Sequence, residues 1–273
     1  MESRIAQAID LKFNPVAVVL ADEEPEQALR FKPGKWGCVM FLFASAAKGR
    51  TAAFDRESYG CWGGGVGLGF GNAYQQFPGG EACFAHFLSS GNEQWETGRT
   101  VGKALEEQAG KAFAEDFLDG ERYRKNPELV HDFIAELPIT DVPTRYVLFK
   151  PLGDVAAGLE TPRTVVFVVD ADQLSALVIL ANYARRGIEN VIIPWAAGCQ
   201  TIGILPYAEG DREHPRAVVG LTDISARKAV RKTLGKDHLT FAMPWRLFQK
   251  MEENVSGSFL EHRTWASLRD LEQ

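Results

Sequence analysis

The stretch "RTVVFVVDADQLSALVILANYARRGIENVIIPWAA", residues 163–197, has the pattern of a strand, a helix and a second strand. Residues 163–170 and 190–197 are apolar runs rich in valine and isoleucine, which is typical of buried strands. Residues 171–187 lie between them, have a helical composition and end at a glycine. A strand, a crossover helix and another strand predict a βαβ unit, with two parallel strands in a covered sheet.

The same alternation continues on both sides of this unit. Further strands are predicted at 15–21, 145–152, 216–223 and 238–245, and helices at 1–10, 38–49, 98–118, 224–234 and 244–255. We therefore expect an α/β or α+β fold, in which helices cover a mixed sheet. Residues 1–273 are interpreted as a single domain, with an N-terminal half rich in cysteine and glycine (about 1–140) and a C-terminal α/β half (about 141–273).

Composition limits the classes of protein to which the chain can belong. Apolar residues make up 45% and charged residues 24%, as in ordinary globular proteins. The net charge of −6 disfavours a nucleic-acid partner, and the basic segment 227–232 is interpreted as a solvated helix face. No run of 18 apolar residues predicts a membrane span, and the N-terminus lacks the features of a signal peptide. A cytoplasmic protein with reduced cysteines is expected.

A second stretch, "YGCWGGGVGLGFGN" at residues 59–72, holds seven glycines and one cysteine. It has neither the third glycine of a dinucleotide-binding fingerprint nor the Gly-Lys-Ser/Thr of a P-loop. Gly63, Gly67 and Gly71 are spaced by four, so in a helix they would share one face and allow another backbone to approach. The alternative is a backbone collar around a bound group, to which Gly60, Gly63 and Gly64 would contribute.

The four cysteines are Cys38, Cys61, Cys83 and Cys199. No two of them form a C-x-x-C pair, so the common zinc-ribbon and thioredoxin signatures are absent. A glycine nevertheless precedes three of them directly, at Gly37, Gly60 and Gly198. Glycine at such positions leaves backbone N–H groups free to face a sulfur, as proteins do around cluster thiolates. Four inert thiols and a shared metal or cluster site both remain open at this point.

The quoted glycine stretch, "NPVAVVLADEE" (14–24), "GCVMFLFASAAKGR" (37–50) and "AAGCQTIGILPYAEG" (196–210) together resemble the bacterial and archaeal family called domain of unknown function number 169. The resemblance extends from about residue 8 to about residue 250. Cys38, Cys61 and Cys199 occupy typical cysteine positions of that family. The sequence departs from the family pattern at "VGLTDISARKAV" (219–230), where a cysteine is missing and only Arg227 is retained. The resemblance implies a thiolate site without naming a reaction.

We therefore expect Cys38, Cys61, Cys83 and Cys199 to hold an iron–sulfur cluster, of the [4Fe–4S] type. Structural zinc sites usually join closely spaced ligands in small modules, whereas these cysteines are dispersed through a large chain. Trp36, Trp62, Phe84 and Trp195 are the aromatic residues expected to shelter the cluster. If Cys83 does not bind, one iron would keep an open position.

Two alternatives are kept beside the cluster. One is a metal-free protein that binds or senses a small molecule, and the other is an enzyme with a reactive Cys61 or Cys199. The sequence has no Ser-His-Asp order or nucleophile elbow, and His86 is more typical of a packing histidine than of a ligand. The expected partner is a redox protein or a small-molecule ligand, and the apolar N-terminal third is compatible with a homo-oligomer. Asp170 or Asp172, and Asp223, are predicted helix N-caps.

Overall fold

The computed structural model of this chain describes residues 1–270 and divides them into two compact units. The first unit combines residues 1–71 with the chain from residue 140 onward, and the second unit comprises Asn72–Ile139. The first unit therefore draws on both of the halves distinguished in the sequence. Among the described residues, no helix has the length and apolar character needed to cross a membrane.

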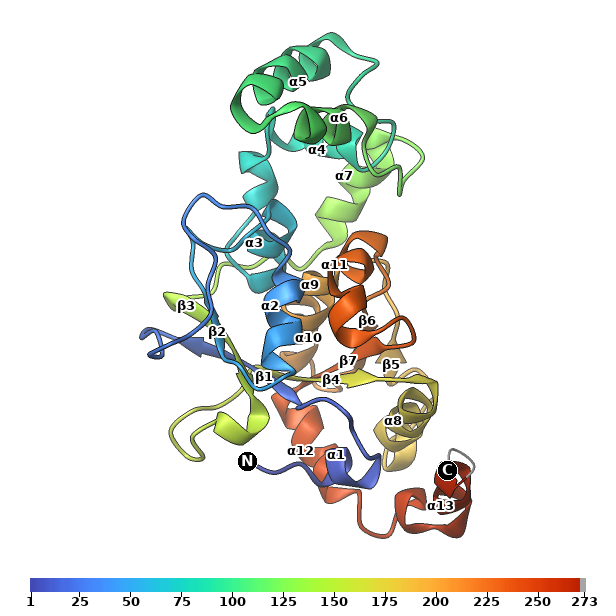
Figure 1. Ribbon diagram of the computed structural model, residues 1–273. Helices are drawn as coiled ribbons and strands as arrows, with labels where there is room; N and C mark the ends of the chain where they lie inside the picture. The colour runs from blue at the N-terminus through green and yellow to red at the C-terminus, as the bar shows by residue number, and fades with distance from the viewer. Residues whose placement is uncertain (271–273) are drawn as a thin grey trace. The chain divides into compact units, whose positions relative to one another are not determined.

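The first unit is built from a sheet and helices on both of its faces (Figure 1). Its elements in chain order are α1 (Arg4–Ala8), β1 (Val16–Ala21), α2 (Val39–Ala46), β2 (Ala52–Phe54), α3 (Trp62–Leu68), β3 (Tyr146–Pro151), η2 (Leu152–Asp154), β4 (Thr164–Val169), α8 (Ala171–Tyr183), β5 (Val191–Ile192), α9 (Gly198–Ile202), α10 (Ile204–Gly210), β6 (Ala217–Gly220), α11 (Ile224–Leu234), β7 (Leu239–Pro244), α12 (Trp245–Glu253), η3 (Phe259–Glu261) and α13 (Arg263–Asp270).

Within the described residues, seven strands form one sheet in the order β2-β3-β1-β4-β7-β6-β5. All neighbouring pairs are antiparallel except β5 and β6, which are parallel. The predicted mixed sheet covered by helices is thus confirmed. Strands β4 and β5 point the same way and are joined by α8, as predicted for a βαβ unit. They are not neighbours, however, because β7 and β6 lie between them, and β5 is shorter than predicted.

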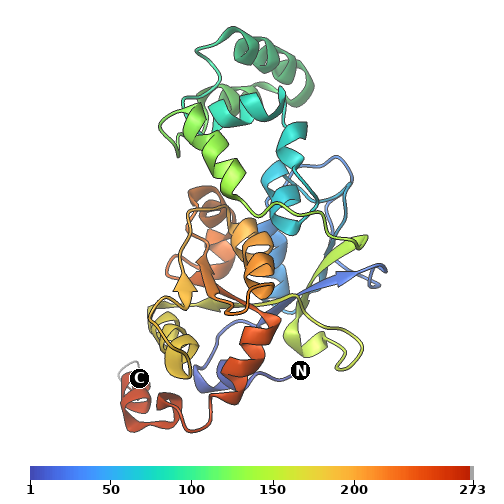
Figure 2. The same ribbon diagram turned by 180° about the vertical axis from the view of Figure 1, so that it is seen from behind.

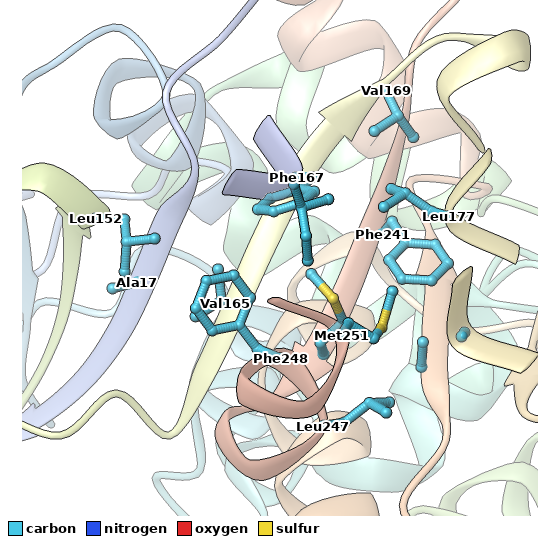
Figure 3. Packing of buried hydrophobic residues seen from close by; sticks show 14 of the residues in the cluster. Ala17, Leu152, Val165, Phe167, Val169, Leu177, Phe241, Leu247, Phe248 and Met251 are labelled. Carbon is cyan, nitrogen blue, oxygen red and sulfur yellow. The ribbon is translucent and has the colours of Figure 1, made fainter. Parts of the chain in front are cut away.

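Both faces of the sheet are buried, which explains why its central strand reads as an uninterrupted apolar run. On one face, Val165 and Phe167 of β4 join a core with residues from α1, α8 and α12, and Figure 3 shows Phe248 and Met251 of α12 against them. On the other face, α2, α9 and α10 pack on the strands. Figure 2 shows α9 and α10 (orange) across the sheet from α12 (red).

Local sequence signals set the helix boundaries. Asp170 begins α8 with a capping box, because its side chain accepts from the Gln173 N–H while the Gln173 side chain accepts from the Asp170 N–H. Asp223 begins α11 in the predicted cap position and accepts from the Ala226 N–H at 2.6 Å. The short strand β2 was not predicted, because it is only three residues long.

The second unit is helical, with η1 (Ala73–Gln76), α4 (Gly80–Phe87), α5 (Glu96–Ala109), α6 (Lys111–Asp119) and α7 (Pro127–Glu136). The single helix predicted at 98–118 is wrong. Gly110 has a φ of 90°, which ends α5 and starts α6 in a new direction. Tyr74 stacks on Phe84 in the core of this unit, with ring centroids 3.9 Å apart.

A half-buried ion pair on β3 gives the first unit a pH-dependent contribution to stability. Lys150 Nζ lies 2.8 and 2.7 Å from the two carboxylate oxygens of Glu160, and the Ala156 N–H donates to the same carboxylate. Burial raises the pKa of Glu160, but the hydrogen bonds from Lys150 and Ala156 outweigh burial, so the net pKa is lowered. The pair therefore stabilises the fold at pH values above the pKa that Glu160 has in the unfolded chain. This contribution is lost as the pH falls through the lower pKa that Glu160 has in the folded chain.

We expect Glu160→Gln to lower the free energy of unfolding at pH 7 by about 1.5 kcal/mol, the scale of a hydrogen-bonded charge. The deficit relative to wild type should shrink as the pH is lowered below about 4. Urea unfolding at a series of pH values measures it. Glu213→Gln is the matched control, because Glu213 is 90% exposed and its pairing should contribute almost nothing. A deficit that stayed constant down to acidic pH would contradict this account.

Candidate metal centre

Three of the four cysteines lie at the starts of helices in the first unit. Cys38 is the N-cap of α2, and Cys61 is the N-cap of α3. Cys199 lies in the first turn of α9. Helix starts have free N–H groups and the positive end of the helix dipole, so each thiol sits where a negative sulfur would be stabilised.

The glycines that precede Cys38 and Cys61 bring these two helix starts together. A Cβ atom on Gly60 would lie 2.4 Å from the carbonyl oxygen of Gly37, and the Phe31 ring packs against both glycines. No larger residue fits at either position without moving backbone or ring. Glycine is therefore needed before Cys38 and before Cys61, because the two segments that carry these cysteines lie in close contact.

Gly198, which precedes Cys199, allows the start of α9 to pack closely against α2 and α11. A Cβ on Gly198 would lie 3.0 Å from Met40 Cγ of α2 and 3.1 Å from Ala226 Cβ of α11. The Gly198 N–H also donates a hydrogen bond to the carboxylate of Asp223. The starts of α2, α9 and α11 consequently meet at one place.

The glycine stretch itself packs α3 onto α9. A Cβ on Gly67 would lie 2.8 Å from Cys199 Sγ, and a Cβ on Gly203 would lie 1.9 Å from the Gly67 carbonyl oxygen. The predicted close backbone contact is confirmed for Gly67. The predicted helical row through Gly71 is wrong, because α3 ends at Leu68 and Gly69 adopts the left-handed conformation of a C-cap.

Two hydrogen bonds fix the thiols at this contact. The Cys199 thiol donates to the carbonyl oxygen of Gly63 at 3.1 Å. Cys61 Sγ accepts from the Gly64 N–H at 3.3 Å, which is the N-cap interaction of α3. A Cβ on Gly63 would meet nothing within 4 Å, so the backbone beside Cys199 borders open space at that point.

The three thiols and Asp223 share one electrostatic neighbourhood. Burial raises the pKa of Cys38 to about 12, with Cys61 and Asp223 adding to the increase. Burial also raises the pKa of Cys199 far above that of a free thiol, again with contributions from Cys61, Cys38 and Asp223. Without a bound cation, Cys38 and Cys199 are therefore neutral at pH 7.

Asp223 was predicted only as a helix cap, and its place beside the thiols was missed. Its carboxylate caps α11 through the Ala226 N–H and also accepts from the Gly198 N–H. Burial raises its pKa, and these two N–H groups oppose the increase. Nothing in "GLTDIS" distinguishes this aspartate from an ordinary cap, because its partner Gly198 lies far away in the sequence.

Cys83 belongs to the second unit and is not among the thiols that the first unit brings together. It is buried in α4, where a Cβ on Gly79 would lie 2.3 Å from its sulfur, and burial raises its pKa. His86 is in the same helix and stacks on Trp95 at 4.4 Å, as a packing histidine does. This stacking explains the position of His86 without any role as a metal ligand.

Two of the aromatic residues that were expected to shelter the cluster, Trp36 and Phe84, lie in other surroundings. Trp36 is 64% exposed, and Phe84 packs in the core of the second unit. Arg227, the residue retained from the family pattern, donates to the carbonyl oxygens of Leu221, Lys236 and His238. It holds the loops around α11 in place.

The sequence model of domain of unknown function 169, described as "Uncharacterised ArCR", matches residues 4–254. The chain belongs to this family. The resemblance stated from its cysteine and glycine motifs is thereby confirmed. No curated protein and no solved structure matches the sequence.

In this family member, the described residues contain no three His, Cys, Asp or Glu side chains arranged to bind a single metal ion. A cluster imposes a different spacing on its ligands, because each thiolate binds its own iron atom. The potential donors of the site are three thiols, and thiolate sulfur is the ligand type of iron–sulfur clusters.

Proposed function

We propose that this protein holds an iron–sulfur cluster of the [4Fe–4S] type on Cys38, Cys61 and Cys199. The observation that carries the proposal is the packing of Gly60 against the Gly37 carbonyl and of Gly67 against Cys199, which brings the starts of α2, α3 and α9 together. The three cysteines come from segments far apart in the sequence, and a glycine beside each of them is needed for the helices to pack so closely. A shared ligand for the three thiols would explain this arrangement.

The surroundings of the thiols fit a negatively charged cluster. The N–H groups of Met40 and Phe41 favour the thiolate form of Cys38, and that of Gln200 favours the thiolate form of Cys199. The burial that raises both thiol pKa values also excludes water, and bound iron would displace the protons. Hydrogen bonds from N–H groups to the sulfurs and low solvent exposure are two of the features by which proteins set cluster potentials.

Three cysteines leave one iron without a thiolate from this set. Asp223 already accepts hydrogen bonds at both carboxylate oxygens, so its present arrangement positions α9 and α11. Cys83, predicted as the fourth ligand, is not required in this proposal. A bound cluster of this kind supplies one-electron transfer or a binding position for a small molecule.

A reactive-thiol enzyme that uses Cys199 is less well supported by the same site. A nucleophilic cysteine needs a lowered pKa and access to solvent. Cys199 has a raised pKa and is only 5% exposed. A small-molecule pocket beside Gly64 and Gly67 is disfavoured as well, because Val39 and α9 fill the space next to these two glycines, whereas Gly63 borders open space.

Mössbauer spectroscopy of the protein reconstituted anaerobically with ⁵⁷Fe and sulfide tests this assignment. A three-cysteine cluster predicts one iron environment distinct from the others, and the spectrum of Cys83→Ser should match that of wild type. Four equivalent cysteine-bound irons, or a spectrum altered by Cys83→Ser, would contradict the three-cysteine set. Absence of any cluster spectrum would contradict the proposal as a whole.

A further inference from the structure

Large apolar side chains are exposed beside the thiol site. Trp36 is 64% exposed and lies two residues before Cys38, and Phe41 is 53% exposed in the first turn of α2. Ile224 is 67% exposed and directly follows Asp223. Each of these three residues lies within three positions in the chain of Cys38 or Asp223.

Helices α2 and α11, which carry Phe41 and Ile224, both begin beside Gly198. Met40 of α2 and Ala226 of α11 both lie within 3.1 Å of the Cβ position of Gly198. The helices pack against each other, as Figure 1 shows. Phe41 and Ile224 therefore belong to one surface, which we call the α2–α11 face. Its exposed residues on the two helices are Phe41, Ile224, Lys228, Arg231 and Lys232, and Lys35, Trp36 and Lys48 are exposed in the segments that flank α2.

The α2–α11 face is basic in an acidic protein. Residues 31–54 and 224–236 contain nine of the 30 lysines and arginines and none of the 36 acidic residues. The lysines at positions 35, 48, 228 and 232 are exposed, and no described carboxylate pairs with them. The chain as a whole carries a net charge of −6, so this face differs in sign from the rest of the molecule.

We infer that the α2–α11 face docks a small acidic electron-carrier protein, an inference that rests on the proposed cluster function. An apolar centre with a charged rim is the usual anatomy of a protein–protein interface. The basic rim would attract a carrier of opposite charge and orient it toward the thiols. In the transfer, the reduced carrier loses one electron and the cluster gains it, with no bond formed or broken.

Such a contact is expected to be transient and sensitive to salt. Electron-transfer encounters bury small interfaces, so charge contributes mainly through the rate of association. Exposed charges are screened within about 10 Å at 0.1 M salt. Binding should therefore weaken steeply as the ionic strength rises.

The test compares two variants of equal net charge. Lys228→Glu/Lys232→Glu reverses two exposed charges on α11, and Lys250→Glu/Arg263→Glu reverses two exposed charges on α12 and α13. Helix α12 packs on the opposite face of the sheet from α2. The probe is an acidic ferredoxin, and its binding is titrated calorimetrically at low salt with both the cluster-loaded and the cluster-free protein.

We expect the α11 variant to bind ferredoxin at least about tenfold more weakly than wild type, and the control variant to stay within about twofold. Phe41→Ala should weaken binding without altering its salt dependence. Equal binding by the two charge variants, or no ferredoxin binding by wild type, would overturn the inference. So would charge-sensitive binding of a short single-stranded RNA, or self-association through this face, in place of ferredoxin binding.

Failure of the cluster proposal gives a different result. If iron and sulfide do not bind but ferredoxin still binds the cluster-free protein at this face, the docking surface stands without the redox role. If the cluster forms and stopped-flow reduction by ferredoxin is equally fast in both charge variants, the cluster stands and the docking surface is wrong.

Discussion

Replacing Cys61 by serine is expected to reduce bound iron from about four atoms per chain to less than about one. Cys38→Ser and Cys199→Ser should do the same, because a three-thiolate site has no spare ligand. Serine retains the size of cysteine and can still donate to Gly63 from position 199. Each variant is reconstituted anaerobically and assayed for iron, acid-labile sulfide and visible absorption.

Cys83→Ser is the matched control for this series. Its sulfur is packed within α4 of the second unit, so a hydroxyl there should cost stability, by about 1–2 kcal/mol, while iron content stays at the wild-type level. Circular dichroism and thermal unfolding of the cluster-free variants separate misfolding from ligand loss. Full iron in any of the three site variants, or iron loss confined to Cys83→Ser, would contradict the assignment.

Replacing Gly203 by alanine is expected to destabilise the first unit by about 3 kcal/mol or more. The new Cβ would lie 1.9 Å from the Gly67 carbonyl oxygen and 3.1 Å from the Cys199 carbonyl oxygen, so the backbone of α3 or α9 would have to move. Because α3 and α9 carry Cys61 and Cys199, separating them should also abolish iron binding. Urea unfolding of the cluster-free protein measures the first effect.

Gly153→Ala controls for the general effect of adding a methyl group to a glycine. A Cβ at Gly153 would meet nothing within 4 Å, and its φ lies outside the left-handed region. Its effect on the free energy of unfolding should stay within about 1 kcal/mol. If Gly203→Ala were as stable as Gly153→Ala, the close α3–α9 contact would not exist as described.

Much of the fold could be predicted from local pattern. The boundaries of α11 agree with the predicted helix at 224–234, and β1, β3, β4 and β7 lie within the predicted strands. The strands are apolar runs, and α11 begins at a capping aspartate and ends before Gly235. The order of the strands could not be predicted, because insertion of β7 and β6 between β4 and β5 depends on long-range pairing.

The candidate site was only partly visible in the sequence. Glycines before Cys38, Cys61 and Cys199 signalled that these cysteines share a structural role, and the contacts of Gly37, Gly60 and Gly198 explain that signal. The same signal is absent at Cys83, which follows an alanine. The convergence of Asp223 with Cys199 could not be predicted, since it follows from the packing of α11 against α2.

The most direct measurement is the iron and acid-labile sulfide content of the wild-type protein purified without oxygen, together with its visible absorption spectrum. The account predicts about four irons and about four sulfides per chain, with broad visible absorption that is lost on exposure to air. A colourless protein that contains no iron even after reconstitution would contradict it. The convergence of Cys38, Cys61 and Cys199 would then be a packing arrangement of three neutral thiols.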